Sequence, residues 1–336
     1  HDFDGGRAYY TGGGHTNESY EEAEFLKHLL AGLQYTIGEN LELDYDAAKS
    51  ERTPEENRFT KTTLSMGQFT EPTEMTILPN LDILVAQRRG ELLLYNQATG
   101  ELKEIAKFDV YWKTDVQGVN AEEGLMGIQK DPNYATNNWV YAFYAPTGDK
   151  EINRLSRFKY KDGKWDMGSE QIILELYSQR NICCHTGGSI AFDKDGNLFL
   201  STGDNSTPFN QQGSKYTLNG YAPVDSREGN KQWDARRSSG NSNDLRGKIL
   251  RIKVAEDGTY TIPEGNLYPK GTEGTRPEIY AQGLRNPYRI SVDQKNGFLY
   301  WGEVGPDANN DSLDIKGPRG YDEVNQARKA GHFGWP

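Results

Sequence analysis

The side chain best placed for proton chemistry is a histidine that follows two adjacent cysteines. His185 stands directly after Cys183 and Cys184, and Asp204 comes nineteen residues further along the chain. A neutral imidazole can take a proton from a hydroxyl group near neutral pH, provided that a partner on its other nitrogen fixes the tautomer. The spacing predicts a general base with Asp204 as that partner. The structural alternative is a histidine that hydrogen-bonds loop carbonyls.

Two later segments carry groups suited to binding. Arg285 and Asn286 place a planar, permanently charged guanidinium beside a carboxamide, which suits a ligand with carboxylate or quinone oxygens. Such a pair also commonly braces a loop. Gly305 and Pro306, followed by Asp307, offer the oxygen ligands that hard cations prefer, although the run lacks the spacing of an EF-hand loop.

Two glycines follow the histidine. Gly187 and Gly188 bring no side chains, so the backbone there can pass close beside a flat ligand. A bulge at the start of a strand requires the same residue type. The sequence leaves both interpretations open.

These candidates are separated by segments that indicate short strands. The chain has 37 glycines and 11% aromatic residues, and its apolar residues occur in short runs between Asn, Asp and Gly clusters. A loose repeat of strand, turn and more apolar strand appears four times, with further strands between the copies. The copies lie at 75–86, 127–144, 190–200 and 290–300, and the additional strands at 101–108, 155–160 and 249–254.

Repeats of this kind predict a mainly β fold, a β-propeller in which each copy belongs to one blade. The wide spacing of the copies predicts long loops on one face, where a site would be built. The polar segment 205–243 is one of these loops and contains Trp233, the tryptophan least expected to pack within a blade. About four blades are covered, which leaves open edges, so we expect the chain to be truncated at both ends.

Residues 1–40 have a different pattern from the rest. A short buried strand is expected at Gly5–Tyr10, and a helix is expected to begin near Ser19. Segment 41–62 is charged and poor in apolar residues, which predicts a linker or a surface strap. The propeller would then occupy residues 63–336.

Charge and composition argue against some partners. The formal net charge is −11 and the Lys and Arg residues form no basic cluster, so nucleic acid is not an expected partner. A neutral or cationic small molecule is easier to bind. No apolar run approaches the roughly 18 residues that cross a bilayer, so no transmembrane segment is predicted in this sequence.

The propeller region resembles the soluble quinoprotein sugar dehydrogenases, the glucose/sorbosone dehydrogenase family. The resemblance covers residues 63–336 and implies a six-bladed propeller that holds pyrroloquinoline quinone on a calcium ion. Residues 1–40 resemble the last part of a ThuA-like (trehalose utilisation) domain, an α/β fold. The matching stretches, in order, are 69–96, 122–134 (EEGLMGIQKDPNY), 185–206 (HTGGSIAFDKDGNLFLSTGDNS), 283–307 (GLRNPYRISVDQKNGFLYWGEVGPD) and 331–336 (GHFGWP).

The resemblance also implies roles for the candidate residues. His185 would remove the proton of the substrate's anomeric hydroxyl while hydride passes to the quinone, and Asp204 would orient the imidazole. Arg285 and Asn286 would lie against the quinone, and Arg285 would stabilise the charge that develops on its oxygens.

The cation and cofactor contacts follow from the same resemblance. The carbonyl oxygens of Gly305 and Pro306 would bind the calcium that polarises the quinone. Glu122 stands where the family often has a glutamine that contacts the cofactor. A glutamate there would add negative charge near an anionic quinone.

Three residues depart from the glucose-oxidising members of the family. Thr186 replaces the glutamine that follows their catalytic histidine, so the sugar contacts need not carry over. Cys183 and Cys184 are also unlike those enzymes. Adjacent cysteines can close a disulfide ring, as in the larger quinoprotein alcohol dehydrogenases, where the ring lies on the quinone. Free buried thiols and a ring with only a structural role are the alternatives.

The prediction is an oxidoreductase that oxidises a sugar or polyol and passes electrons to an acceptor such as a cytochrome c domain. It would work in the periplasm or outside the cell, with membrane attachment through other parts of the protein left open. One alternative is a propeller that binds or scaffolds a partner, which Glu122 and Thr186 favour. Another is a calcium-dependent hydrolase of lactones or esters, in which His185 would activate water.

Overall fold

The chain divides into two compact units, residues 1–63 and 64–336, which we describe separately. Most of the predicted linker, from residue 41 to 58, lies outside the described residues. The computed structural model describes residues 2–3, 6–14, 16–38, 59–116, 119–208, 223–311 and 319–336.

The first unit contains a two-stranded ribbon and a helix. Strand β1 (Asp2–Phe3) pairs antiparallel with β2 (Gly6–Arg7), and a 3-10 turn, η1 (Asn17–Glu21), precedes helix α1 (Ala23–Ile37). The predicted helix exists, but it begins at Ala23. The buried strand was wrong, because only two of its residues are in a strand and the described ones are mostly exposed. The ThuA-like assignment stays a prediction.

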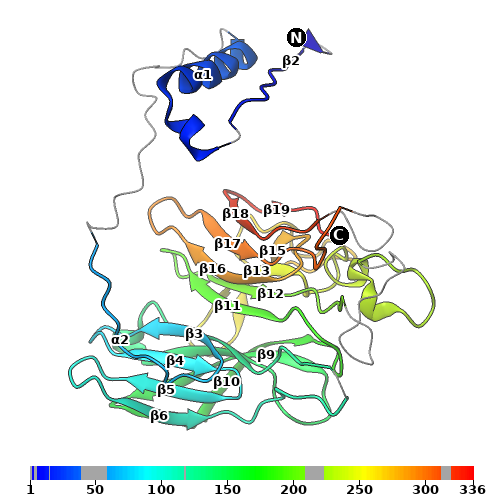
Figure 1. Ribbon diagram of the computed structural model, residues 1–336. Coiled ribbons are helices and arrows are strands. Elements are labelled where there is room, and N and C mark those ends of the chain that lie inside the picture. The colour runs from blue at the N-terminus through cyan, green and yellow to red at the C-terminus, as the bar shows by residue number, and fades with distance from the viewer. Residues whose placement is uncertain are drawn as a thin grey trace. The chain divides into compact units, whose positions relative to one another are not determined.

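The second unit is a β-propeller arrangement of four blades that follow one another along the chain (Figure 1). The first blade contains β3 (Pro72–Ile77), β4 (Ile83–Gln87), β5 (Glu91–Tyr95) and β6 (Leu102–Lys107). The second contains β7 (Leu125–Lys130), β8 (Trp139–Tyr144), β9 (Ile152–Lys161) and β10 (Lys164–Tyr177), with a short helix α2 (Tyr134–Asn137) after β7.

The later blades are less regular. The third contains β11 (Gly187–Phe192), β12 (Leu198–Thr202), β13 (Lys248–Val254) and β15 (Ile279–Gln282), with β14 (Tyr260–Thr261) paired to β13. The fourth contains β16 (Pro287–Val292), β17 (Leu299–Glu303) and β18 (Glu323–Ala327). The last strand, β19 (Gly331–His332), returns to the third blade and pairs with β15 in parallel.

The mainly β propeller fold predicted from the repeats is confirmed. Each repeat forms the first hairpin of a blade, and strands β6, β9 and β13 cover the additional strands that were expected. Turn chemistry explains these hairpins: the carboxylate of Asp193 accepts the backbone N–H groups of Asp195 and Asn197 between β11 and β12. Strands β5, β10, β15 and β18 were not foreseen.

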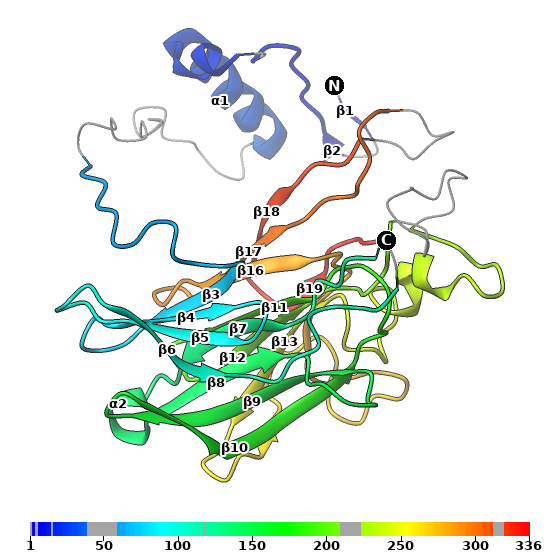
Figure 2. The same cartoon turned by 60° about the horizontal axis from the view of Figure 1, so that its bottom comes forward.

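Apolar side chains fill the space between neighbouring blades. Between the first two blades this core includes Leu84, Leu92, Phe108, Val140 and Phe158, each at most 1% exposed. Burial of such a side chain stabilises the fold by about 1.5–3 kcal/mol. The first strands contact one another in the order β3, β7, β11, β16 (Figure 2). This packing fixes the blades relative to one another.

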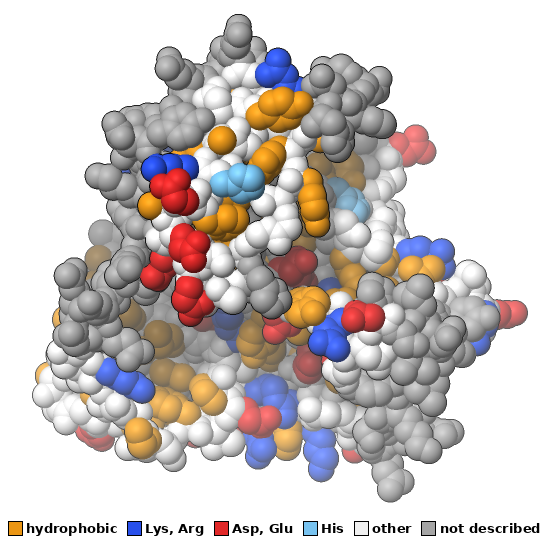
Figure 3. Space-filling model, turned by 45° about the horizontal axis from the view of Figure 1, so that its top comes forward, with side chains coloured by type: hydrophobic (Ala, Val, Ile, Leu, Met, Phe, Trp, Pro, Cys, Tyr) orange, Lys and Arg blue, Asp and Glu red, His pale blue; other side chains and the backbone are white. Residues whose placement is uncertain are grey.

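One end of the blades collects all the loops that carry the candidate residues. Because the first two strands of a blade are antiparallel, the chain enters the first strand and leaves the second at the same end. The relevant loops precede β7, β11 and β16 and follow β12 and β17. No helix among the described residues is long and apolar enough to cross a membrane. On the face that Figure 3 shows, Lys and Arg side chains are scattered and do not form one patch.

Candidate active site

His185 and Asp204 lie side by side at this end of the third blade. His185 belongs to the loop before β11 and Asp204 follows β12, so the pairing of these two strands brings them together. Imidazole Nδ1 of His185 lies 2.7 Å from Oδ1 of Asp204. The two side chains are 5% and 0% exposed. The residues that the spacing paired are therefore in hydrogen-bond contact.

The surroundings of Asp204 keep it ionised. Burial alone would raise the pKa of this carboxyl group, but the adjacent His185 and several hydrogen bonds lower the pKa to about 2. The backbone N–H and hydroxyl of Ser206 and the indole N–H of Trp335 all donate to it. An ionised Asp204 accepts from Nδ1, so the basic lone pair of a neutral His185 is on Nε2.

The backbone of His185 is in the left-handed region, with φ at +62°. Its N–H donates to Oε2 of Glu122 at 2.7 Å, and its carbonyl accepts the N–H of Asn205 at 3.2 Å. A Cβ at Gly203 would overlap that carbonyl, so only glycine lets the two loops come this close. Glu122 therefore helps to hold the backbone that presents the imidazole.

Gly187 and Gly188 form a bulge at the start of β11. Both have positive φ, and the register against β12 shifts between Gly187 and Ile190. A Cβ at Gly188 would lie 2.6 Å from Met126 and 2.9 Å from Phe143. Packing between blades thus requires glycine, and the structure favours the bulge over the close approach of a ligand.

The carboxylate of Glu303 fixes the turn that carries Arg285 and Asn286. Its Oε1 accepts the backbone N–H of Arg285 at 2.9 Å and that of Asn286 at 2.6 Å, and its Oε2 accepts the indole N–H of Trp301 at 3.1 Å. The carboxamide of Asn286 in turn accepts the N–H of Gly187 at 3.0 Å. Burial raises the pKa of Glu303 to about 7. Sequence reasoning missed Glu303.

Arg285 and His185 line the same cavity, which measures about 330 Å³. This volume is at the lower end of the range of about 300–1,000 Å³ for small-molecule sites. Pro306 and Trp335 are also part of its wall. The guanidinium of Arg285 donates to Asp307 at 2.5 Å and lies 5.8 Å from the centre of the Trp335 ring. The structure thus brings three sequence-predicted residues, His185, Arg285 and Pro306, to one cavity.

Trp335 is the second site residue that sequence reasoning missed. The parallel pairing of β19 with β15 returns the end of the chain to the third blade, and the N–H of Trp335 donates to the carbonyl of Gly283 at 3.0 Å. Trp233, the tryptophan expected to be exceptional, does not line this cavity. The sequence signal for Trp335 was the stretch 331–336. It contributed to the family resemblance but not to the set of candidate residues.

Gly305 and Pro306 follow β17 at the same end of the blades. The carbonyl of Pro306 accepts the N–H of Ala308 at 2.7 Å, and the N–H of Gly305 donates to Asp322 at 3.0 Å. The carbonyl of Gly305 accepts no hydrogen bond from the described residues. Because a carbonyl oxygen has two lone pairs, both oxygens retain capacity for a cation.

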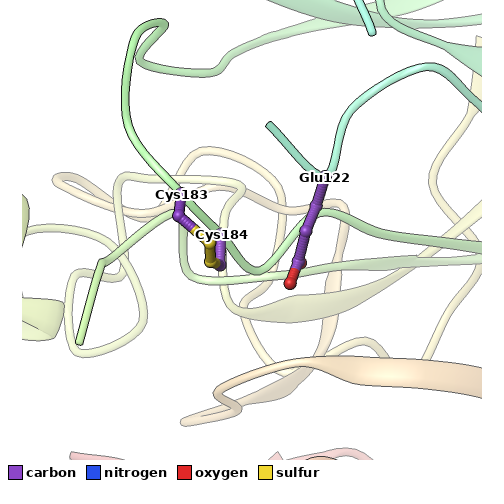
Figure 4. Close-up of side chains that lie close together, drawn as sticks. All are labelled: Glu122, Cys183 and Cys184. Carbon is purple, nitrogen blue, oxygen red and sulfur yellow. A yellow bond between two sulfur atoms is a disulfide. The ribbon is translucent and has the colours of Figure 1, made fainter. Parts of the chain in front are cut away.

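Cys183 and Cys184 are joined to each other by a disulfide. Of the alternatives for these cysteines, the structure has the ring, not free thiols. Glu122 lies beside the ring (Figure 4), and one of its oxygens and the two sulfurs are within 4.8 Å of one another. None of the three lines the cavity of His185 and Arg285. Their contact with a cofactor stays a prediction.

A buried lysine supports the loop behind Asp204. Lys248, at the start of β13, donates to the carbonyls of Ser238, Ser239 and Arg246 at 2.8, 3.0 and 2.8 Å. The hydroxyl of Ser238 donates to the backbone carbonyl of Asp204 at 2.6 Å. Burial lowers the pKa of Lys248 to about 7. Nothing in the sequence distinguishes this lysine from those on exposed strand positions.

Residues 69–336 match the family model of glucose/sorbosone dehydrogenase. The chain belongs to this family. It is 24% identical over 268 residues to the aldose sugar dehydrogenase YliI of Escherichia coli, covering 79% of this chain and 58% of that protein. To the quinoprotein glucose dehydrogenase B of Acinetobacter calcoaceticus it is 24% identical over 264 residues, 77% of this chain and 48% of that one. The chain thus spans about half the length of these relatives.

Other similar proteins extend this picture. An oxidoreductase of the glucose dehydrogenase type from Thermus thermophilus has a TM-score of 0.58 at 26% identity, over 80% of this chain and 65% of its own. The PQQ-bound aldose sugar dehydrogenase of Streptomyces coelicolor has a TM-score of 0.56 at 24% identity, over 82% of this chain and 65% of its own. The mouse Hedgehog-interacting protein is 25% identical over 210 residues, 58% of this chain and 26% of that protein. The family therefore includes sugar dehydrogenases, and its relatives include an interaction protein.

Proposed function

We propose that this protein oxidises a hydroxyl group of a sugar or polyol, with pyrroloquinoline quinone as hydride acceptor and a calcium ion beside it. The observation that carries this proposal is the buried pair of His185 and Asp204 at a cavity that Arg285 also lines. Relatives named as an aldose sugar dehydrogenase and a quinoprotein glucose dehydrogenase support it.

The residues at the cavity fit a flat, anionic quinone. Arg285 and Arg319 supply positive charge and Trp335 supplies an aromatic face. For calcium, the carbonyl oxygens of Gly305 and Pro306 have the chemistry that a hard cation takes. Further oxygens would have to complete the six to eight ligands that calcium usually binds.

When bound, the quinone accepts a hydride and the calcium polarises its oxygens. The chain's own residues accept the proton of the substrate and stabilise the charges that develop. Nε2 of His185 takes the proton of the substrate hydroxyl, because Nδ1 is occupied by Asp204. The ionised Asp204 stabilises the imidazolium that results. Arg285, held by Glu303 through its backbone, directs a permanent positive charge to the cavity.

The test is to add pyrroloquinoline quinone and calcium to the full-length apoprotein, then aldoses and polyols, and to follow the absorption of the bound quinone. We expect reduction of the quinone by at least one substrate. His185→Gln should lower kcat by roughly 10²–10⁴-fold, whereas His28→Gln, in the first unit, should not change it. If no sugar or alcohol reduces the bound quinone, or His185→Gln is as active as the parent, the proposal is wrong.

A second candidate is a propeller that binds a partner without catalysis. The guanidinium of Arg285 is already paired with Asp307, which weakens its ability to hold an anionic cofactor. The Hedgehog-interacting protein among the relatives is compatible with this function. Calorimetry distinguishes the two: no heat of quinone binding in the presence of calcium favours the binding module. Lactone hydrolysis without quinone would instead indicate a hydrolase.

We also propose an oxidising compartment, the periplasm or the cell exterior, because the disulfide between neighbouring cysteines would be reduced by cytosolic thiols. Electrons would then pass to an acceptor such as a cytochrome c domain. Cell fractionation and thiol labelling of the native protein test this, since a cytosolic protein with two free thiols would contradict it.

A further inference from the structure

Glu122, Cys183 and Cys184 form a group of potential metal ligands apart from the cavity of His185 and Arg285 (Figure 4). Glu122 comes from the loop before β7 and the cysteines come from the loop before β11. One carboxylate oxygen and the two sulfurs lie within 4.8 Å of one another. Among the residues that the structure describes, no other three His, Cys, Asp or Glu side chains come together in this way.

The donor set suits a thiophilic cation and not calcium. Two thiolates with one carboxylate are ligands for Zn²⁺ and similar divalent ions, whereas calcium takes oxygen alone. With Zn–S near 2.3 Å and Zn–O near 2.1 Å, a tetrahedral ion separates its ligands by about 3.6–3.8 Å. The two sulfurs, now bonded to each other, would have to move apart to this separation after reduction, and the Glu122 oxygen, which lies within 4.8 Å of them, would have to take up the same spacing. Glu122 and Cys183 are half-buried, so water can supply a fourth ligand.

The charge around Glu122 also favours a cation. No Lys or Arg forms an ion pair with Glu122 among the described residues, whereas its neighbour Glu123 is paired with Arg180 at 3.4 Å. Among the described residues, Glu122 accepts a hydrogen bond from the backbone N–H of His185. Since a carboxylate has about four lone-pair positions, it can bind an ion and keep this hydrogen bond.

The disulfide determines whether the sulfurs can bind a metal ion. A thiolate is the metal ligand, and two sulfurs joined to each other offer none. An added phosphine or dithiol supplies two electrons, two protons complete the thiols, and the reductant is oxidised. A bound divalent ion then displaces both thiol protons. We propose that reduced Cys183 and Cys184, with Glu122, form a binding site for a thiophilic divalent cation such as Zn²⁺, which the disulfide closes.

Cobalt(II) is the probe, because thiolate ligands give it a charge-transfer absorption in the near ultraviolet that oxygen ligands do not. The full chain is reduced with a water-soluble phosphine, freed of the phosphine without air, and titrated with cobalt in excess calcium. No quinone or sugar is present, so the result is independent of the proposed dehydrogenase activity. We expect one equivalent of cobalt with thiolate absorption in the reduced protein and none in the disulfide form.

Matched variants assign the ligands. Cys183→Ser combined with Cys184→Ser should abolish the absorption, and Glu122→Gln should weaken cobalt binding by about tenfold or more. Glu101→Gln, which changes an exposed carboxylate, is the control and should leave the affinity unchanged. Equal cobalt binding by the oxidised and reduced protein, or an affinity that Glu122→Gln does not alter, would overturn the proposal. If Glu122→Gln does not fold by circular dichroism, Glu122→Asp decides: weaker binding supports the site, and unchanged binding contradicts it.

Discussion

The indole N–H of Trp335 donates to Oδ2 of Asp204 at 2.7 Å, although 131 residues separate them in the sequence. Asp204 is fully buried, and this hydrogen bond is one of those that keep its carboxyl group ionised. The segment that follows β19 therefore contributes directly to the state of the proposed catalytic pair.

Trp335→Phe should destabilise the fold and weaken the catalytic pair. The change keeps most of the ring but removes a hydrogen bond to a buried charge, at a cost of about 1.5–3 kcal/mol. The free energy of unfolding in urea measures it. Trp165→Phe is the matched control, because the indole N–H of Trp165 donates to the sulfur of Met167 and not to a charged group among the described residues. Equal losses in the two variants would contradict the importance of the Asp204 contact.

Asp204→Asn should reduce kcat by roughly 10²–10⁴-fold with little change in KM. A carboxamide does not stabilise the imidazolium, and it can present its N–H₂ to Nδ1, which selects the wrong tautomer of His185. The measurement is steady-state kinetics with the quinone-loaded protein. If KM rises and kcat is unchanged, Asp204 serves binding and not proton transfer.

Protonation of Asp204 should also lower the stability of the fold in acid. Its folded-state pKa of about 2 lies below the ordinary 3.8, so the carboxylate stabilises the fold above the unfolded-state pKa. This contribution, about 2 kcal/mol, is lost as the pH falls from about 4 through about 2. Urea unfolding across this range should show a steeper loss for the parent than for Asp204→Asn. Asp195→Asn, an exposed position, should follow the parent.

Glu303 should make cofactor binding depend on pH near neutrality. Above about pH 7 its carboxylate accepts all three N–H groups, whereas the protonated, uncharged group below that pH is a weaker acceptor. The turn with Arg285 and Asn286 is then held less firmly, so quinone affinity should fall as the pH drops through about 7. Calorimetric titration at several pH values measures this. Glu303→Gln should bind more weakly and lose the pH dependence.

The contribution of Glu303 to the stability of the fold changes with pH in the opposite direction to that of Asp204. Its folded-state pKa is raised above the ordinary 4.5, so ionisation is harder in the folded protein than in the unfolded one. Its contribution to stability therefore decreases as the pH rises from about 4.5 to about 7 and is constant above that. In Glu303→Gln this part of the pH dependence should be absent. An identical slope in both proteins would show that Glu303 titrates normally.

Lys248→Met should cost about 2–4 kcal/mol of stability, because three carbonyls lose their donor in a buried place. Lys253→Met, an exposed position on the same strand, is the control and should have little effect. Thermal unfolding compares the two. A small effect at Lys248 would mean that the carbonyls of the loop find other donors.

Local patterns allowed the prediction of local structure. Alternating apolar residues and turns that contain Asp or Asn identified all four first hairpins, and the strand, turn and strand between His185 and Asp204 predicted their contact. Glu303, Trp335 and Lys248 were missed for a common reason: each binds groups on loops, and the strand pattern does not specify the paths of loops. The bulge at Gly187 and Gly188 was left open because the side chains that exclude a Cβ at Gly188, Met126 and Phe143, belong to the neighbouring blade.

The pairing of β19 with β15 joins the end of this segment to its middle. During synthesis, residue 204 leaves the ribosome well before residue 335, so the nascent protein has its histidine and aspartate long before it has the indole that completes them. A polypeptide that is stopped before residue 331 would retain the hairpins of the four described blades and lack the hydrogen bond from Trp335. The catalytic pair is thus completed only after the fourth blade has been synthesised.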